Sequence, residues 1–196
     1  MENNMIQCYG FNSTLDKDTK ILILGTLPPC NRNWYYEEDY KMWQIIGRAT
    51  NNTINLVKLS KIEKEKLITQ NKIAFWDIFK SAYRINGSAK DKDLRNMESN
   101  NLKQELQKKN AKPEIIIVNG FNKKENKISA FKLFKDYNNL SKESNIDAEI
   151  NIRYFMWDNI RVYPMRATSA IERLKNKSDI DWENAWIKLL KKHIRT

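Results

Sequence analysis

The sequence predicts an α/β domain in which helices cover both faces of a central, mainly parallel sheet, a three-layer α/β/α arrangement. Three short aliphatic segments indicate buried strands, at residues 21–24, 73–76 and 115–118. Stretches of helical length separate these segments, and strands that alternate with helices are typical of a parallel sheet with right-handed crossovers. The chain has 196 residues, and we expect it to form a single domain over residues 1–196.

The remaining elements follow from local periodicity. Helices are expected where apolar residues recur at helical spacing or where charged residues dominate, and strands where apolar residues alternate. The expected helices are residues 37–48, 61–70, 91–110, 127–137 and a C-terminal helix that buries Trp182 and Trp186. Further strands are expected at 150–156 and 160–163, and the polar stretch 138–148 is expected to be a mobile loop.

The composition is that of a folded and strongly basic protein. Hydrophobic residues make up 41% of the chain and aromatic residues 11%, so that a buried core can form. There are 35 Lys and Arg against 24 Asp and Glu, which gives a formal net charge of +11. Such a charge attracts polyanions, and nucleic acid is the commonest one in a cell, although a lysine-rich, AT-biased genome would produce the same excess.

Several classes of protein are excluded by residues that the chain lacks. No basic start is followed by an apolar segment, and no apolar run approaches membrane length, so we expect a cytoplasmic protein with no membrane contact. Cys8 and Cys30 are the only cysteines, too few for a disulfide framework or a four-cysteine metal site. His193 is the only histidine and lies on an apolar helix face, which predicts packing rather than catalysis. We expect a monomer with no metal and no cofactor.

Aromatic and polar residues follow the first predicted strand, at the edge where parallel sheets bind ligands. The loop after this strand contains Thr26 and Pro28, and Tyr35 and Tyr36 come next. Tyrosine rings in this position could stack on a base, or they could be ordinary interior residues.

Two later strand ends offer further candidates. Asp77 follows Trp76 at the end of an apolar strand, where a carboxylate could accept hydrogen bonds from a base or cap the next helix. Arg166, Thr168 and Ser169 follow the last predicted strand, where hydroxyl and backbone N–H groups could grip a phosphate or cap a helix.

Five segments, taken in order, carry a resemblance to a known protein family. They are "ILILGTLPP", "NWYYEEDYKMWQIIG", "KIAFWDIFKSAYRINGSAKDKDL", "PEIIIVNG" and "YPMRATSA", followed by Trp182 and Trp186. They run in unbroken order from about residue 20 to about residue 190, and the segment that begins "KIAFWDIF" is the most specific. This pattern resembles the uracil-DNA glycosylase superfamily, in particular its mismatch-specific and hypoxanthine-type branches.

The resemblance implies a uracil-DNA glycosylase-like fold and a DNA repair enzyme. Such an enzyme flips a nucleotide out of DNA and hydrolyses its N-glycosidic bond without a metal or cofactor, and nearby carboxylates stabilise the positive charge that develops on the sugar. The residues that the resemblance assigns to the base are Thr26, Tyr35, Tyr36, Trp76 and Asp77. The residues assigned to the DNA are Pro28, Arg166, Thr168 and Ser169.

The chain departs from the family pattern where the family positions water. One branch carries Asn in its first-strand motif, where this chain has Leu27, and the hypoxanthine-type branch carries Asn after the tyrosine pair, near Tyr40 or Lys41 of this chain. Asp39, and after it Glu38, are therefore the catalytic candidates, expected to orient water and oppose the positive charge. The remaining amides are Asn31 and Asn33.

Three functions compete at this point. The first is a monofunctional DNA glycosylase for a deaminated base, uracil or hypoxanthine, acting in base excision repair. The second is a catalytically inactive module of the same fold that binds DNA or a nucleotide, and the third is an unrelated α/β hydrolase or transferase for small substrates. Hot alkali cuts DNA at an abasic site, so an oligonucleotide with one such base distinguishes the first function from the other two.

Overall fold

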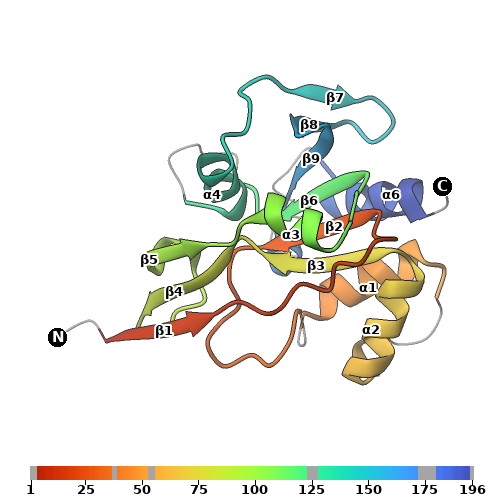
Figure 1. The fold of residues 1–196 in the computed structure, drawn as a ribbon. Helices are drawn as coiled ribbons and strands as arrows, with labels where there is room; N and C mark the ends of the chain where they lie inside the picture. Colours follow the sequence, from red (N-terminus) through yellow and green to blue (C-terminus); the bar gives the residue numbers. More distant parts are fainter. Residues whose placement is uncertain (1–3, 37–38, 53–55, 123–127, 172–179, 195–196) are drawn as a thin grey trace.

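The computed structural model describes residues 4–36, 39–52, 56–122, 128–171 and 180–194. Within these ranges the central sheet has the strand order β3-β2-β6-β9-β8-β7, stacked from the bottom to the top of the view in Figure 1. Its parallel strands are β2 (Ile21–Gly25), β3 (Ile73–Asp77), β6 (Ile115–Asn119) and β9 (Ile160–Met165). The antiparallel strands β8 (Ile152–Trp157) and β7 (Asn145–Asp147) complete one edge. The predicted α/β class with a mainly parallel sheet is confirmed.

The three aliphatic segments form the centre of this sheet, as the sequence predicts. Every residue of β3 is buried, and so are the aliphatic residues of β2 and β6, which requires cover on both faces of the sheet. Helix α1 (Tyr40–Ala49) packs against α6 (Trp182–Ile194), which contacts β2, and α4 (Ala130–Tyr137) contacts β6. In the described part of the chain, no helix has the length and apolar character needed to cross a membrane.

Capping residues set where the helices begin. Asp39 accepts a hydrogen bond from the backbone N–H of Met42, so α1 starts at Tyr40 rather than at the predicted residue 37. Helix α2 (Lys61–Gln70) begins after a capping box formed by Ser60 and Glu63, and its bounds are the predicted ones. Ser129 caps α4, which therefore begins at Ala130, and the predicted start at residue 127 lies outside the described residues.

A second, antiparallel sheet was missed by the sequence prediction. It has the strand order β1-β4-β5 and lies at the left of Figure 1, with β1 (Met5–Tyr9), β4 (Phe79–Ile85) and β5 (Leu94–Ser99). The predicted helix 91–110 is wrong over its first half, because residues 94–99 pair with β4 and satisfy their backbone groups there. The 3-10 turn η2 (Asp91–Asp93) precedes β5, and α3 (Leu102–Lys108) starts after its cap Asn101. The predicted loop 138–148 contains the short strand β7.

A disulfide joins Cys8 of β1 to Cys30 in the loop after β2. This bond was not expected from the sequence, because two cysteines are too few for a disulfide framework. The bond links the antiparallel sheet to the loop that follows β2.

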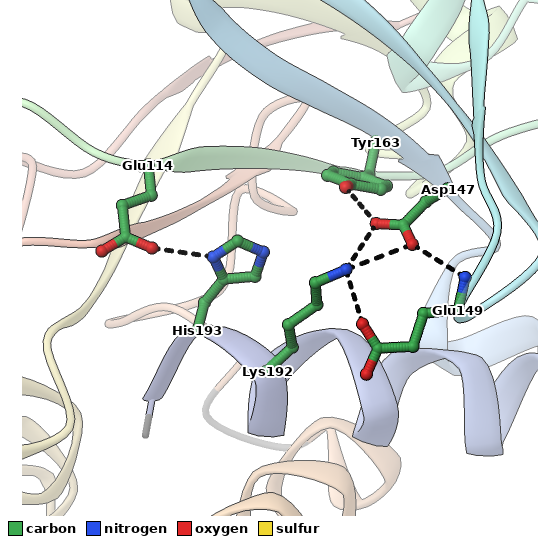
Figure 2. A network of polar contacts seen from close by, with 6 residues as sticks. All are labelled: Glu114, Asp147, Glu149, Tyr163, Lys192 and His193. Carbon is green, nitrogen blue, oxygen red and sulfur yellow. Dashed lines mark hydrogen bonds and ion pairs between the residues drawn. The ribbon is translucent and has the colours of Figure 1, made fainter. Parts of the chain in front are cut away.

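A polar network joins the C-terminal part of α6 to β7, to β9 and to the residue before β6. Figure 2 shows the network, whose residues are Glu114, Asp147, Glu149, Tyr163, Lys192 and His193. Buried Asp147 accepts a 2.7 Å hydrogen bond from the Tyr163 hydroxyl, and Lys192 lies 3.2 Å from it. Nearby, His193 contacts Glu114 at 2.9 Å, so the only histidine has the packing role that the sequence predicts. Burial acts to raise the pKa of Asp147, but the hydrogen bonds from Tyr163 and Lys192 outweigh it and hold that pKa below 3.8.

We expect Asp147→Ala to lower the free energy of unfolding by about 2 kcal/mol at pH 7, because it leaves the Tyr163 hydroxyl without its acceptor. A carboxyl with a lowered pKa stabilises the fold above 3.8 and loses this effect as the pH falls through the lower folded value. Urea unfolding at pH 7 and pH 3 measures both effects, and the difference between the two proteins should shrink at pH 3. A difference that is equal at both pH values would contradict the ionic role of Asp147.

Candidate functional site

A large cavity lies at the carboxyl ends of the parallel strands. Its volume is about 1400 Å³. Four neighbouring strands deliver residues to it: Gly25 ends β2, Asp77 ends β3, Asn119 ends β6, and Thr168 follows β9. The segments that supply its walls are far apart in the sequence and meet because parallel strands end at one edge of the sheet.

Gly25, at the end of β2, leaves space open beside the side chains of Asp77 and Tyr36. Gly25 pairs with Asp77 in the ladder, and its carbonyl accepts a 2.9 Å hydrogen bond from the N–H of Ile78. A Cβ atom at Gly25 would stand 3.1 Å from Asp77 Oδ1 and 3.4 Å from the Tyr36 hydroxyl. Gly25 therefore leaves open the space that these two polar groups border.

Tyr36 is held in a backbone conformation that bulky residues rarely adopt. Its φ angle is 49°, and its carbonyl accepts hydrogen bonds from the Trp43 indole and from the N–H of Asp39, at 2.8 and 2.9 Å. These bonds fix the backbone of Tyr36, whose ring packs on Phe75 and which lines the cavity wall. The buried Tyr36 hydroxyl makes no hydrogen bond of good geometry within the described residues. Burial raises the pKa of this tyrosine, and the nearby Asn119 side chain offsets part of that rise.

Asp77 is a buried carboxyl group at the cavity wall. Its side chain accepts a 3.2 Å hydrogen bond from the N–H of Phe11 through Oδ2, and the residue is 4% exposed. Burial raises its pKa to about 7, although the Phe11 N–H, the Tyr35 hydroxyl and the charge of Arg84 act in the opposite direction. Burial therefore favours the protonated form of this carboxyl group.

Asp39, Thr168 and Asn119 form a chain of hydrogen bonds along one side of the cavity. The Thr168 hydroxyl donates to Asp39 Oδ2 at 2.5 Å, while Asp39 Oδ1 accepts from the N–H of Met42 at 3.0 Å. The N–H of Thr168 donates to Asn119 Oδ1 at 3.0 Å. The Asn119 oxygen is thereby identified, and its NH₂ group is the end that remains to act as a donor. The loop after β9 thus fixes both the carboxylate and the amide.

Buried Arg84 fastens the loop that follows β2. Its guanidinium donates to the carbonyl of Leu27 at 2.6 Å and to the carbonyls of Ser88 and Lys90 at 2.8 and 3.4 Å. The Thr26 hydroxyl donates to Asp91 at 2.6 Å, which is a second link between the loop after β2 and residues 88–91. Arg84 therefore holds the shape of one cavity wall from outside the cavity.

The structure brings most of the predicted site residues together. Those that line the cavity are Thr26, Pro28, Tyr35, Tyr36, Asp39, Asp77, Thr168 and Ser169. Trp76 and Arg166 do not line the cavity. Neighbouring residues of a strand point to opposite faces of the sheet, so the side chain of Trp76 points away from the face of Asp77. The guanidinium of Arg166 packs on Phe121 and Trp182 and donates to the Phe121 carbonyl. Glu38 lies outside the described residues.

Two residues of this site were not singled out by the sequence analysis. Asn119 ends a strand before a glycine, and this "NG" signal marked the strand end without indicating that the amide lines the cavity. Arg84 lies on β4, a strand that was not predicted, so nothing in its local sequence indicated the contact with Leu27. In the ranges that the structure describes, no cluster of three or more His, Cys, Asp or Glu residues could hold a metal ion.

Comparison with known proteins gives sequence similarity over part of the chain and structural similarity over nearly all of it. Hypoxanthine DNA glycosylase of Methanosarcina acetivorans is 34% identical over 79 residues, which are 38% of this chain and 49% of that protein. Hypoxanthine DNA glycosylase of Methanosarcina barkeri is 29% identical over 79 residues, with the same shares. The chain thus matches about half the length of these curated relatives. No family model matches the chain.

A solved structure illustrates the similarity over the whole fold. It is the solution NMR structure of a Methanosarcina acetivorans protein provisionally described as a uracil DNA glycosylase. The TM-score is 0.66 at 22% identity, and the superposition covers 97% of this chain and 100% of the other. Together with the sequence matches, it confirms the family resemblance that the five segments indicated.

Proposed function

We propose that this chain removes a deaminated base from DNA. Its fold is that of the uracil-DNA glycosylase superfamily, and its sequence is similar to proteins of the hypoxanthine-type branch. The reaction is hydrolysis of the N-glycosidic bond of uracil or hypoxanthine by a monofunctional glycosylase. The proposal rests on the convergence of a carboxylate, an amide and two tyrosines on one cavity, namely Asp39, Asn119, Tyr35 and Tyr36. The cavity exceeds the roughly 300–1,000 Å³ of small-ligand pockets, which suits a nucleotide still attached to its strand.

In this proposal the tyrosines and the amide receive the flipped base. Tyr36 stacks on the base, since two hydrogen bonds hold its backbone at the cavity wall and its ring packs on Phe75. Tyr35 supports it from behind, because the Tyr35 hydroxyl is already bound to the Phe11 carbonyl at 2.9 Å. The NH₂ group of Asn119 donates to a carbonyl oxygen of the base and stabilises the anion as the base departs.

Asp39 performs the chemical step. Cleavage of the glycosidic bond places positive charge on the sugar, and a carboxylate close to the sugar opposes that charge and orients water for attack. Thr168 and Met42 fix both oxygens of Asp39, so the carboxylate needs little reorganisation during the reaction. Its lone pairs that are not engaged by these donors accept from the water.

DNA is the proposed partner, and the protein acts as a cytoplasmic monomer. The net charge of +11 favours binding to the phosphate backbone. Pro28 and Ser169 lie at the cavity wall, on the two loops that would meet the strands on either side of the flipped nucleotide.

An abasic-site assay tests the function directly. Oligonucleotides with one central uracil or hypoxanthine are incubated with the protein, in single- and double-stranded form, and then treated with hot alkali. We expect a cut at the modified position and none in the unmodified control. Salt-sensitive binding without a cut would support the inactive DNA-binding module instead. If the protein neither binds nor cuts the oligonucleotide, the result would favour an unrelated hydrolase or transferase for small substrates.

A further inference from the structure

The two oxygens of the Asp77 carboxyl group have different surroundings. Oδ2 accepts the hydrogen bond from the N–H of Phe11, at 3.2 Å. Oδ1 lies on the Gly25 side, 3.1 Å from the point where a Cβ of that residue would stand, and the Tyr36 hydroxyl lies 3.4 Å from the same point. These three residues line the cavity, so a ligand atom that enters the space beside Gly25 meets Oδ1.

The surroundings favour the neutral form of this carboxyl group. It is 4% exposed, and no Lys or Arg of the described residues forms an ion pair with it. The groups that face it are the phenols of Tyr35 and Tyr36 and, from β4, the guanidinium of Arg84. Arg84 is itself bound to the Leu27 carbonyl and balanced by Asp91. Burial outweighs these contributions and raises the pKa of Asp77 to about 7.

The Phe11 contact decides which oxygen carries the proton. An oxygen that accepts an N–H hydrogen bond is the poorer position for a hydrogen of its own, because two hydrogens would then face each other. The Phe11 contact therefore favours Oδ1 as the position of the proton, where the neutral group presents an O–H donor to the cavity. The ionised group presents an acceptor at the same place.

We propose that Asp77 distinguishes a deaminated base from its parent by donating a hydrogen bond from Oδ1 to the carbonyl oxygen that has replaced the amino group. The inference rests on the proposed function. Deamination converts the N4 amino group of cytosine and the N6 amino group of adenine, both donors, into the carbonyl acceptors of uracil and hypoxanthine. A fixed O–H donor pairs with the carbonyl and opposes the amino group, whereas an ionised Asp77 would do the reverse. The site therefore selects for deaminated bases only while Asp77 holds its proton.

The test compares Asp77→Asn with the wild-type protein across pH. In this variant the amide oxygen takes the place of Oδ2, which accepts from Phe11, and the NH₂ group takes the place of Oδ1 as a donor at every pH. Single-turnover release of uracil and hypoxanthine is measured from pH 5.5 to 8.5. The ratio of the wild-type rate to the variant rate cancels the titration of other groups.

We expect this ratio to be constant below about pH 6.5 and to fall roughly tenfold per pH unit well above pH 7. Asp77→Leu, which has no donor, is expected to be slower than Asp77→Asn by at least about tenfold at every pH. Glu98→Gln makes the same carboxyl-to-amide change at an exposed position of β5 and should leave the pH profile unaltered. A ratio that rises with pH, or an Asn variant as slow as the Leu variant, would overturn the inference.

Binding separates this inference from the proposed function. Affinity is measured for single-stranded oligonucleotides that carry one central uracil or, in the control, cytosine. If no base is released at any pH, the glycosylase proposal fails. A binding preference for uracil that weakens above pH 7 in the wild type and persists in Asp77→Asn would still support recognition of the base by Asp77. Equal affinity for the two oligonucleotides in all variants overturns it.

Discussion

Replacing Asp39 by Ala is expected to lower the single-turnover rate of base release by at least about 100-fold while DNA affinity changes by less than about threefold. Asp39 is the carboxylate that borders both the tyrosine pair and the Thr168 loop, so it is placed to oppose the charge on the sugar. Rate constants at saturating protein report the chemical step, and fluorescence anisotropy with the same oligonucleotide reports binding.

Two further variants separate chemistry from stability. Asp39 also caps α1, so its loss costs about 1 kcal/mol of stability, and Ser60→Ala removes the cap of α2 at a similar cost away from the cavity. Ser60→Ala is expected to keep the wild-type rate. Asp39→Asn keeps the cap through its amide oxygen and can donate to the Thr168 hydroxyl through its NH₂ group, but it lacks the charge, so its rate should lie between those of the Ala variant and the wild type. Full activity of Asp39→Ala would remove this residue from the chemistry.

The second large effect is expected from Arg84. Arg84→Met should lower the free energy of unfolding by about 3 kcal/mol, because it removes the donor for three carbonyls at a site that is 1% exposed. Urea unfolding at neutral pH measures this change. We also expect slower base release from the folded variant, since the loop that carries Thr26 and Pro28 loses one of its two attachments to residues 88–91.

Arg48→Met is the matched control for stability. Arg48 has a similarly short contact, 2.7 Å to Glu183, but its side chain is 56% exposed, and such ion pairs contribute at most about 1 kcal/mol. If the two variants lost the same amount of stability, burial would not be what makes the Arg84 contacts strong.

Local sequence patterns determined the centre of this fold. Three aliphatic runs between helical stretches predicted β2, β3 and β6, because strands covered on both faces must be apolar throughout. The charged stretch 61–70 predicted α2, and the apolar face of α6 was readable from its helical spacing. The same patterns predicted that Tyr36, Asp77 and Thr168 come at strand ends or in the loops after them, which is why they lie at one cavity.

Only the tertiary structure decided the small sheet and the state of the site. Residues 94–99 are a strand because β4 is beside them, and that pairing joins residues that no local period links. Thr168 is 129 positions from Asp39 and 49 from Asn119, and Leu27 is 57 positions from Arg84, so no local pattern links these partners. The raised pKa of Asp77 likewise depends on burial by residues from other elements. A sequence pattern reports which side chains follow a strand, whereas the charge and the hydrogen bonds of those side chains depend on what the fold packs against them.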